Sequence, residues 1–331
     1  MNENRPAAKR RSWLGPLLLL AAAFVWGTTF VAQDLVSETI GSLTFNGVRM
    51  LLGSLLLLPV IAVKNKGRLF ATVRDRESRR ALLLGGGICG VLVFFAGAFQ
   101  QWGIILGTSA GKSGFITAIY VIFVPLVGLF FRRRVPILTW PCVAVAAVGL
   151  YLLCVADFSA GWEGILRDFH FSTGDLLTLV CAFIFTFHIL SVDRFAPKTD
   201  GVWLSCAQFF VGGVIGCVLM MIFERPTVSD VLAASGGIWY SAVVSCVIGY
   251  TLQILGQSRT PPALAALIMC LESVFAVLSD VVFLKTPMKA EEILGCVLLF
   301  AALTVCVSSE GILPGKQNGK NGMNGKKKKE L

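Results

Sequence analysis

The chain has 331 residues, of which 56% are hydrophobic and only 15% are charged, and its mean hydropathy is +0.77. A soluble domain carries about 25% charged residues, so the composition excludes a soluble protein and indicates a polytopic membrane protein. The net charge of +10 does not indicate nucleic-acid binding, because the basic residues cluster in short loops and in both tails, where the positive-inside rule puts them.

Ten apolar stretches follow one another along the chain. A helix of about 20 residues crosses roughly 30 Å of hydrocarbon, and most of these stretches have that length. We therefore expect an all-α protein with ten transmembrane helices, over residues 14–33, 43–63, 81–103, 109–131, 137–155, 174–192, 203–222, 236–256, 261–283 and 289–309.

The distribution of basic residues predicts the orientation. Of the 29 Lys and Arg residues, 23 fall in the tails and the even-numbered loops and four in the odd-numbered loops. The positive-inside rule then predicts that both termini lie in the cytoplasm. We expect the chain to be a multi-pass protein of the cytoplasmic (inner) membrane. Residues 1–13 form a cytoplasmic tail, and residues 310–331 form a basic, disordered one. The terminal KKEL resembles an endoplasmic-reticulum retrieval signal, or simply adds inside charge.

The ten helices divide into five and five, over residues 14–155 and 174–309, joined by an outer loop at 156–173. An odd number of helices in each half forces opposite orientations, so any homology is an inverted repeat. At an offset of 152, Gln101 aligns with Gln253, and Tyr120 aligns with Glu272. Tyr120 and Glu272 lie near the expected bilayer midplane, where inverted-repeat transporters place their substrate sites.

Four stretches in this order resemble one family: FVWGTTFVAQ, TSAGKSGFITAIYVIFVPL, AFIFTFHILSVDRF and LIMCLESVFAVL. The chain is similar to the EamA family of the drug/metabolite transporter superfamily. The resemblance implies two EamA repeats of five helices, and a secondary carrier that moves small organic solutes across the cytoplasmic membrane, often outward. Many members carry a Glu in a "GE-x-L" turn after the ninth helix. This chain reads FLKTPMKAEE there, so Glu291 or Glu292 would have to substitute.

Glu272 is the candidate with the strongest physical argument. A charge at the centre of a transmembrane helix costs about 2.5–3.5 kcal/mol on insertion scales, and such residues usually face a cavity or a partner. Two interpretations remain open. Glu272 faces a cavity, where a carboxyl group that binds and releases a proton can couple transport to H+. Alternatively, it is protonated or hydrogen-bonded and locks two helices together.

His188 and Arg49 are the next candidates. Imidazole titrates near physiological pH, so His188 either takes part in coupling or gating, or is a neutral His bonded to a neighbouring helix. The Arg49 guanidinium either holds a carboxylate or phosphate or extends to the outer headgroups.

Two amides and two aromatic residues complete the predicted binding set. Gln101 and Gln253 either face a central path or bond neighbouring helices. Trp26 lies in mid-helix, away from the interfaces where Trp is usual, and we expect it to stack on a solute together with Tyr120.

No enzyme is predicted. The sequence has no Walker loop, no Gly-x-Ser-x-Gly elbow and no metal-ligand spacing, and the ten cysteines fall in or beside apolar stretches as packing residues. We expect no cofactor and no metal. The prediction is an exporter or exchanger of a small metabolite that works by alternating access. An uncoupled channel, or a membrane-embedded lipid enzyme, is the alternative. A single chain with both repeats can act as a monomer, and the sequence leaves the oligomeric state open.

Overall fold

The computed structural model describes residues 13–68, 70–132, 135–156, 158, 161, 172–283 and 287–309. The tails, and with them the KKEL signal, lie outside the described residues, as does most of the loop 156–173. Within the described ranges every regular element is helical.

The first half of the chain contains the helices α1 (Leu14–Gly27), α2 (Thr29–Ser37), α3 (Ser42–Lys64), α4 (Arg76–Ile105), α5 (Ala110–Ala118), α6 (Tyr120–Phe130) and α7 (Thr139–Cys154). The second half contains α9 (Thr173–Phe195), η2 (Ala196–Lys198), α10 (Gly201–Phe223), α11 (Val228–Ala233), α12 (Ser235–Tyr240), η3 (Ser241–Tyr250), α13 (Thr251–Gln257), α14 (Pro262–Met269), α15 (Glu272–Phe283) and α16 (Ala290–Ser309).

Seven helical spans in the described chain are long and apolar enough to cross a membrane. They are Ser42–Lys64, Arg76–Ile105, Lys112–Phe130, Thr173–Lys198, Gly201–Phe223, Ser235–Gln257 and Ala290–Ser308. Three shorter apolar helices, Leu14–Gly27, Thr139–Cys154 and Pro262–Leu278, coincide with the first, fifth and ninth predicted helices. The structure is therefore that of an all-helical polytopic membrane protein.

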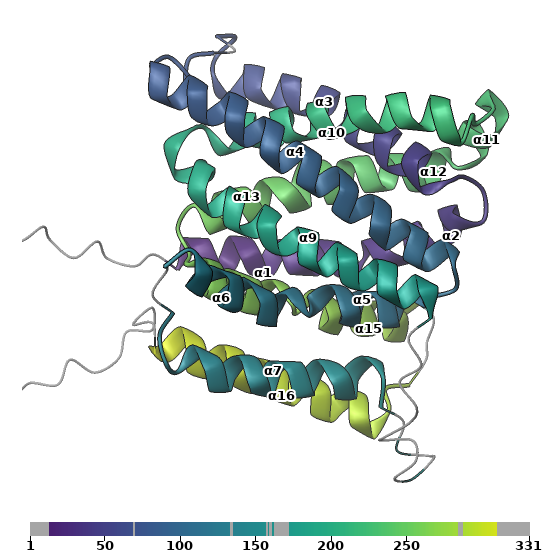
Figure 1. Cartoon of the computed structure of the whole chain (residues 1–331), viewed down its shortest axis with the longest axis vertical. Coiled ribbons are helices and arrows are strands. Elements are labelled where there is room, and N and C mark those ends of the chain that lie inside the picture. The colour runs from purple at the N-terminus through teal and green to yellow at the C-terminus, as the bar shows by residue number, and fades with distance from the viewer. Residues whose placement is uncertain are drawn as a thin grey trace, which may run out of the picture.

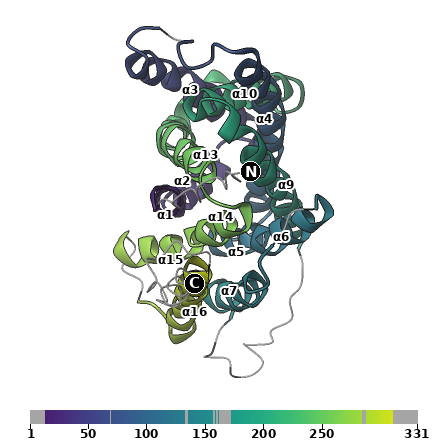
Figure 2. The same cartoon turned by 90° about the vertical axis from the view of Figure 1, so that its left-hand side faces the viewer.

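The helices run side by side and stack along the long axis of the molecule (Figure 1). The pair α3 and α10 lies at one end of the stack, and the pair α7 and α16 at the other; Figure 2 shows the same order along the helix axes. The most extensive contacts join α3 to α10, α4 to α9 and α7 to α16. Each of these pairs takes one helix from each half, so the halves interlock.

Three of the predicted helices are interrupted, which corrects the expectation of continuous helices over 14–33, 109–131 and 261–283. At the first break, Thr28 and Thr29 donate hydrogen bonds from their hydroxyl groups to the carbonyl oxygens of Val25 and Trp26, at 2.7 and 2.8 Å. Hydroxyl groups that bond back to the preceding turn bend helices, which accounts for the change from α1 to α2.

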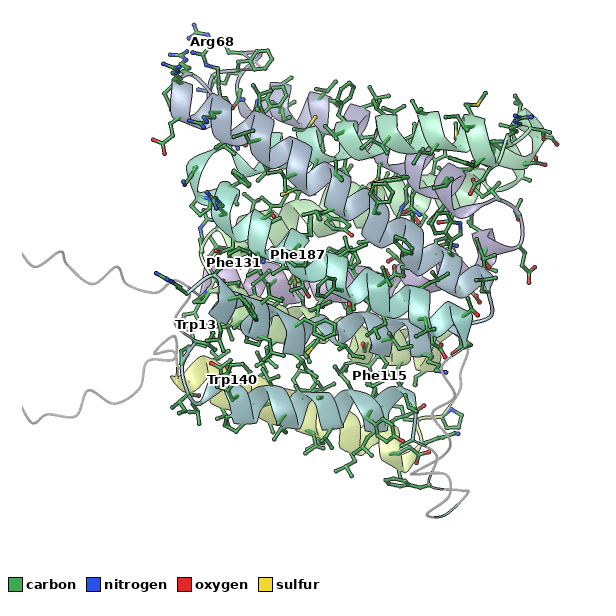
Figure 3. The ribbon with its side chains drawn as sticks, in the orientation of Figure 1. Trp13, Arg68, Phe115, Phe131, Trp140 and Phe187 are labelled. Carbon is green, nitrogen blue, oxygen red and sulfur yellow. The ribbon has the colours of Figure 1, made fainter. Side chains whose placement is uncertain are left out.

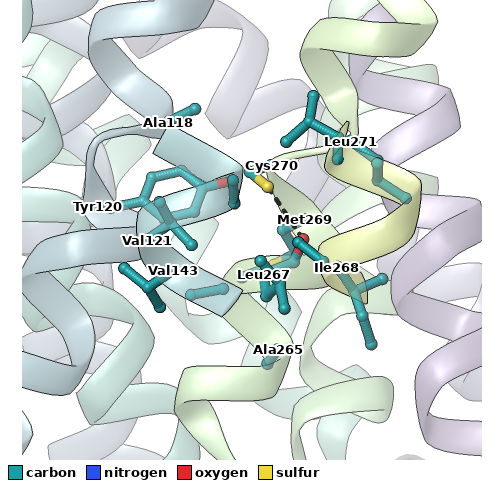
Figure 4. Packing of buried hydrophobic residues seen from close by; sticks show 14 of the residues in the cluster. Ala118, Tyr120, Val121, Val143, Ala265, Leu267, Ile268, Met269, Cys270 and Leu271 are labelled. Carbon is teal, nitrogen blue, oxygen red and sulfur yellow. Dashed lines mark hydrogen bonds between the residues drawn. The ribbon is translucent and has the colours of Figure 1, made fainter. Parts of the chain in front are cut away.

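The other two breaks have the same geometry in the two halves. The N–H of Ile119 donates to the carbonyl oxygen of Ile116 at 3.2 Å, and the N–H of Leu271 donates to Ile268 at 3.2 Å. These bonds reach three residues back rather than four, which tightens the turn. Cys270 adds a bond from Sγ to the carbonyl oxygen of Leu267 at 2.9 Å (Figure 4).

One helix begins with a cap from the distant half of the chain. The residue before α3 is Gly41, which offers no side-chain acceptor. The Glu224 carboxylate, which follows α10, fills this place. It accepts from the N–H of Leu43 at 2.8 Å and from the N–H and hydroxyl group of Thr44 at 2.7 and 2.6 Å. A carboxylate also stabilises the positive end of the helix dipole, so Glu224 fixes α3 against α10.

Two large apolar clusters form the core. One gathers residues of α5, α6, α7, α14 and α16, and the other gathers residues of α3, α4, α10 and η3. Trp26 and Phe185 are partly buried and pack against both clusters. The boundary between the clusters therefore runs through these two side chains.

The ion pair of Lys64 and Asp200 yields a pH-dependent prediction. The two charged groups are 2.7 Å apart, and Asp200 also caps α10. Burial raises the pKa of the Asp200 carboxyl, but the hydrogen bonds from Lys64, Thr72 and the backbone of Trp203, with the charge of Lys64, together outweigh burial, so the pKa lies below its ordinary value. A lowered pKa stabilises the fold above the unfolded value of about 3.9, and this contribution is lost as pH falls through the folded pKa.

We expect Asp200→Asn, which keeps a capping side chain, to lower the free energy of unfolding at pH 7 by at most about 1 kcal/mol, because Lys64 is partly exposed. The difference from the wild type should shrink as pH falls below about 4 and disappear below the folded pKa of Asp200. Unfolding of the purified protein in detergent at both pH values measures this. An equal loss at pH 7 and pH 3 would contradict the role of the charge.

Candidate functional site

A cavity lies at the boundary between the two apolar clusters, beside the helix breaks. The volume of the cavity is about 40 Å³, room for about three water molecules. Its walls come from both halves of the chain. They are formed by Trp26, Thr29, Phe30, Gln33, Arg49, Gln100, Thr117, Tyr120, Phe185, Ile189, Ser245, Tyr250, Gln253, Met269 and Glu272.

Tyr120 and Glu272 meet at this cavity. The Tyr120 hydroxyl donates to Glu272 Oε1 at 3.3 Å, and both residues are buried, with exposed fractions of 4% and 5%. Each residue is the first of the helix that follows a break, α6 and α15. The carboxyl group therefore faces a polar partner and a cavity rather than lipid.

Arg49 brings a positive charge to the same cavity. Its side chain comes from α3, is only 3% exposed and lies over the ring of Phe45 at 4.7 Å from the ring centre. Nε and Nη2 donate to Asn46 Oδ1 at 3.2 and 2.7 Å. Nη1 has no hydrogen-bond partner among the described residues. Arg49 is thus held within the protein rather than extended to the membrane surface.

The amides of the cavity come from different helices. Gln100 Nε2 donates to Thr117 Oγ1 at 2.9 Å. Gln253 Oε1 is buried and has no hydrogen-bond partner in the described part of the chain. The cavity therefore offers an unused donor on Arg49 and an unused acceptor on Gln253. No group of three or more His, Cys, Asp or Glu residues suited to a metal ion occurs within the described ranges.

Trp26 closes one side of the cavity. Its ring meets the ring of Tyr250 edge to face, with 4.8 Å between the centres. The indole lies directly against Gly249, where an added Cβ would be 2.5 Å from Trp26 Nε1. A glycine is therefore needed in η3 to admit the indole. η3 is a π-helix, and π-helical turns often occur at functional sites.

Two of the predicted site residues do not line the cavity. His188 lies behind Tyr250, with 5.9 Å between the ring centres, and its Nε2 is hydrogen-bonded to Gln208 Oε1 at 3.1 Å. Gln101 is buried, and its Nε2 donates to the carbonyl oxygen of Gln33 at 2.9 Å. Successive residues of an α-helix point about 100° apart, so Gln100 faces the cavity and Gln101 faces α2.

Several cavity residues were not singled out from the sequence. Gln100 is the neighbour of the predicted Gln101, and the rotation of α4 about its axis decides which of the two amides faces the cavity. Tyr250, Thr29 and Thr117 resemble ordinary residues of apolar helices. Thr29 and Thr117 lie beside helix breaks. The sequence does not mark these breaks, so it carries no signal that identifies the two residues. Glu291, a suggested substitute for the absent turn Glu, is buried and accepts from the N–H of Phe158 at 3.4 Å, apart from the cavity lining.

The sequence matches the family model of the EamA-like transporters over residues 13–155 and again over residues 172–308. The chain belongs to the EamA-like transporter family. The two matches correspond to the two halves that interlock in the fold, and the cavity lies between them. The family and its name indicate a membrane transporter for small solutes, and transporters are generally not enzymes.

Named relatives agree with this assignment. An uncharacterized transporter of Archaeoglobus fulgidus is 27% identical over 297 residues, which cover 87% of this chain and 83% of the relative. An uncharacterized transporter of Haemophilus influenzae is 26% identical over 234 residues, covering 67% of this chain and 76% of the relative. A solved crystal structure with no functional name has the same fold, with a TM-score of 0.71 at 15% identity, covering 90% of this chain and 98% of that one.

The packing around Arg49 yields a prediction for α4 of this EamA-like protein. Gly97 lies against the guanidinium, and a Cβ there would be 2.6 Å from Asn46 Oδ1 and 3.2 Å from Arg49 Nη2. Gly97→Ala should displace both side chains and destabilise the protein by about 1–3 kcal/mol, the usual cost of overpacking. The control is Gly87→Ala on the same helix, where a Cβ meets nothing within 4 Å.

The control should stabilise the helix by up to about 1 kcal/mol. Thermal unfolding of the two variants in detergent compares them. Equal effects of the two substitutions would show that Gly97 provides no needed space.

Proposed function

We propose that this protein is a secondary transporter that carries a small organic solute through the membrane by alternating access around the cavity. The observation that carries the proposal is the cavity itself. Most of the residues that line it are buried, polar side chains from both halves are among them, and three helices break beside it. Transporters of inverted-repeat folds place their sites at discontinuous helices near the bilayer midplane.

We further propose that ten helices cross the membrane, as inverted repeats over residues 14–155 and 174–309. The Ile119 and Leu271 breaks support this, because they share one geometry at the offset of 152 expected from the sequence. The junctions of the two halves support it too. Thr108 packs against Gly174 at the start of α9, and Thr260 packs against Gly15 at the start of α1.

The orientation that we propose has both termini in the cytoplasm, with the protein in the cytoplasmic membrane. Among the labelled residues, Arg68, Trp13 and Trp140 lie on the same, left-hand side of the molecule, and Phe115 lies to the right of Trp140 (Figure 3). α1 begins and α16 ends on this same left-hand side (Figure 1). The loop at Arg68 is the most basic described loop, which the positive-inside rule places inside.

The roles of the cavity residues follow from their chemistry. Trp26 and Tyr120 offer aromatic faces to the apolar part of a solute. Arg49 and Gln253 hold its polar groups, and Gln100 replaces Gln101 in this role because it faces the cavity. Glu272 is the candidate coupling residue. His188 contacts Tyr250 and would act through it, as a gating residue rather than as a solute ligand.

The helix breaks provide the motion. A continuous helix packed on both sides resists bending, whereas a tightened turn can act as a hinge between its two halves. α1 and α2, α5 and α6, and α14 and α15 can then tilt separately above and below the cavity. Opening one side while the other stays packed is the movement that alternating access requires.

Counterflow in proteoliposomes tests the transport cycle. Vesicles loaded with amino acids, amines, sugars, nucleobases and monocarboxylates, one at a time, receive a trace of the same labelled solute outside. A carrier accelerates uptake of the label when unlabelled solute is inside, and the uptake saturates. Flux that neither saturates nor responds to internal solute would support an uncoupled channel instead. No solute with trans-stimulated uptake would contradict the proposed carrier.

Glu272→Gln tests coupling. We expect wild-type uptake to vary with pH, and the variant to be much less sensitive to pH, because glutamine cannot exchange a proton. The other titratable groups near Glu272 are Arg49, Tyr120 and Tyr250, with the thiols of Cys181 and Cys270. The tyrosine, thiol and guanidinium groups ordinarily titrate above neutral pH.

The matched control for coupling is Glu291→Gln, a buried Glu apart from the cavity lining, which should keep the wild-type pH profile. An unchanged profile in Glu272→Gln would assign Glu272 to packing between α6 and α15 rather than to coupling.

A further inference from the structure

We propose that the solute is a monocarboxylate with an apolar body, and that its carboxylate binds the Arg49 guanidinium. This inference rests on the proposed transport function and names its substrate class. It begins from the Arg49 guanidinium in the cavity wall.

Arg49 is a buried cation that forms no ion pair with any of the residues that the structure describes. Its guanidinium donates hydrogen bonds to the neutral amide of Asn46 and lies over the ring of Phe45. The ion pairs of the described chain join Lys64 to Asp200 and Lys112 to Asp175, and none of them includes Arg49. A buried charge is stable only when it is paired and hydrogen-bonded. The unused Nη1 donor therefore points to an anion that arrives with the solute.

The fold itself does not require a cation at this position. α3 and α10 both contain 23 residues, and aligning their first residues makes Arg49 equivalent to Gln208 and Asn46 equivalent to Ser205. The contacts of Asn46 and Ser205 agree with this alignment. Asn46 lies against Gly97 of α4, and Ser205 is hydrogen-bonded to Thr251 of α13, the helix that precedes the broken helix of the second half as α4 does in the first. In the second half a neutral amide, bonded to His188, stands where the first half has a guanidinium. The positive charge of Arg49 is therefore not needed to build the repeat.

The surroundings favour a carboxylate over a phosphate group. A guanidinium binds either anion through paired N–H groups. Arg49 is the one Lys or Arg among the residues that line the cavity. When the Glu272 carboxyl group carries a proton, this single positive charge balances a carboxylate but not a phosphate dianion. The aromatic rings of Trp26, Phe30 and Phe185 supply an apolar wall. The free Gln253 Oε1 can accept from a hydroxyl or amine group on the same solute.

Binding measured by thermal shift in detergent at pH 7 tests the inference. The probes are benzoate, phenylacetate and isovalerate, each against its primary amide, with inorganic phosphate as a separate arm. A ligand that binds the folded state raises the melting temperature according to its concentration over Kd. We expect at least one acid to raise it, its amide to have little effect, and phosphate to have none.

Arg49→Gln should weaken binding of the acid about tenfold or more, because a hydrogen bond to a charged group is lost. The substitution copies the residue of the equivalent position in α10, so the fold should accept it. Arg49→Lys, which keeps the charge but not the paired donors, should bind with intermediate affinity. The matched control is Arg194→Gln, at an exposed Arg of α9 that is not part of the cavity wall, and it should bind as the wild type does.

The outcomes separate the two proposals. Equal binding of acids and amides, undiminished binding to Arg49→Gln, or a response to phosphate alone would overturn the monocarboxylate assignment. If a neutral solute shows trans-stimulated uptake and no acid binds, the transport function stands and the substrate class is wrong. If an acid binds through Arg49 but no solute shows trans-stimulated uptake, the anion site stands and the carrier function is wrong.

Discussion

The constraint on which this structure depends is that hydrocarbon cannot solvate a polar group. Within the membrane, each polar side chain and each backbone group freed by a helix break needs a partner in the protein or a cavity. Glu272 meets this need through Tyr120, and Gln100 meets it through Thr117. The polar residues of distant segments therefore gather in one place, and the breaks lie where they gather.

This gathering explains why irregular helices are tolerated. The tightened turns at Ile119 and Leu271 would expose backbone groups to lipid if they lay on the outer surface. Both instead lead directly into the residues that contact each other across the cavity, Tyr120 and Glu272. The same turns then serve as hinges for the proposed motion. The interlocked pairs, such as α3 with α10, supply the framework against which the broken helices can move.

The two halves share an architecture but not a charge. Equivalent positions of α3 and α10 hold Arg49 and Gln208, and their partners are Asn46 in one half and His188 in the other. A repeat fixes where side chains can meet, and substitutions within it decide what they bind. We infer that the framework residues serve the transport cycle common to both halves. The asymmetric Arg49 serves the choice of solute.

The cap on α3 shows how strongly the halves depend on each other. Gly41 gives the backbone room but no acceptor, and Glu224, 180 residues and more along the chain from the groups it caps, provides both acceptor oxygens. Because the first N–H groups of a helix have no partners within it, the start of α3 depends on the end of α10. Neither half is complete at this point without the other.

The sequence by itself determined the class of the protein, its apolar helical stretches and five of the fifteen residues that line the cavity. Long apolar stretches can only be stable as helices in a membrane, and a lone carboxyl group such as Glu272 is conspicuous there. Arg49 and the mid-helix Trp26 were predicted in the same way, as residues that do not suit lipid, whereas Tyr120 and Gln253 were predicted from the alignment of the two halves. A single sequence carries both signals.

Only the tertiary structure decided which face each helix turns inward and where the helices break. A rotation of about 100° separates Gln100, which lines the cavity, from Gln101, which bonds α2. His188 suits a cavity equally well by chemistry, yet the packing of α9 against α10 pairs it with Gln208. In helices that are apolar on nearly all sides, no strong amphipathic pattern records the inward face. That face is set by contacts between segments far apart in the chain.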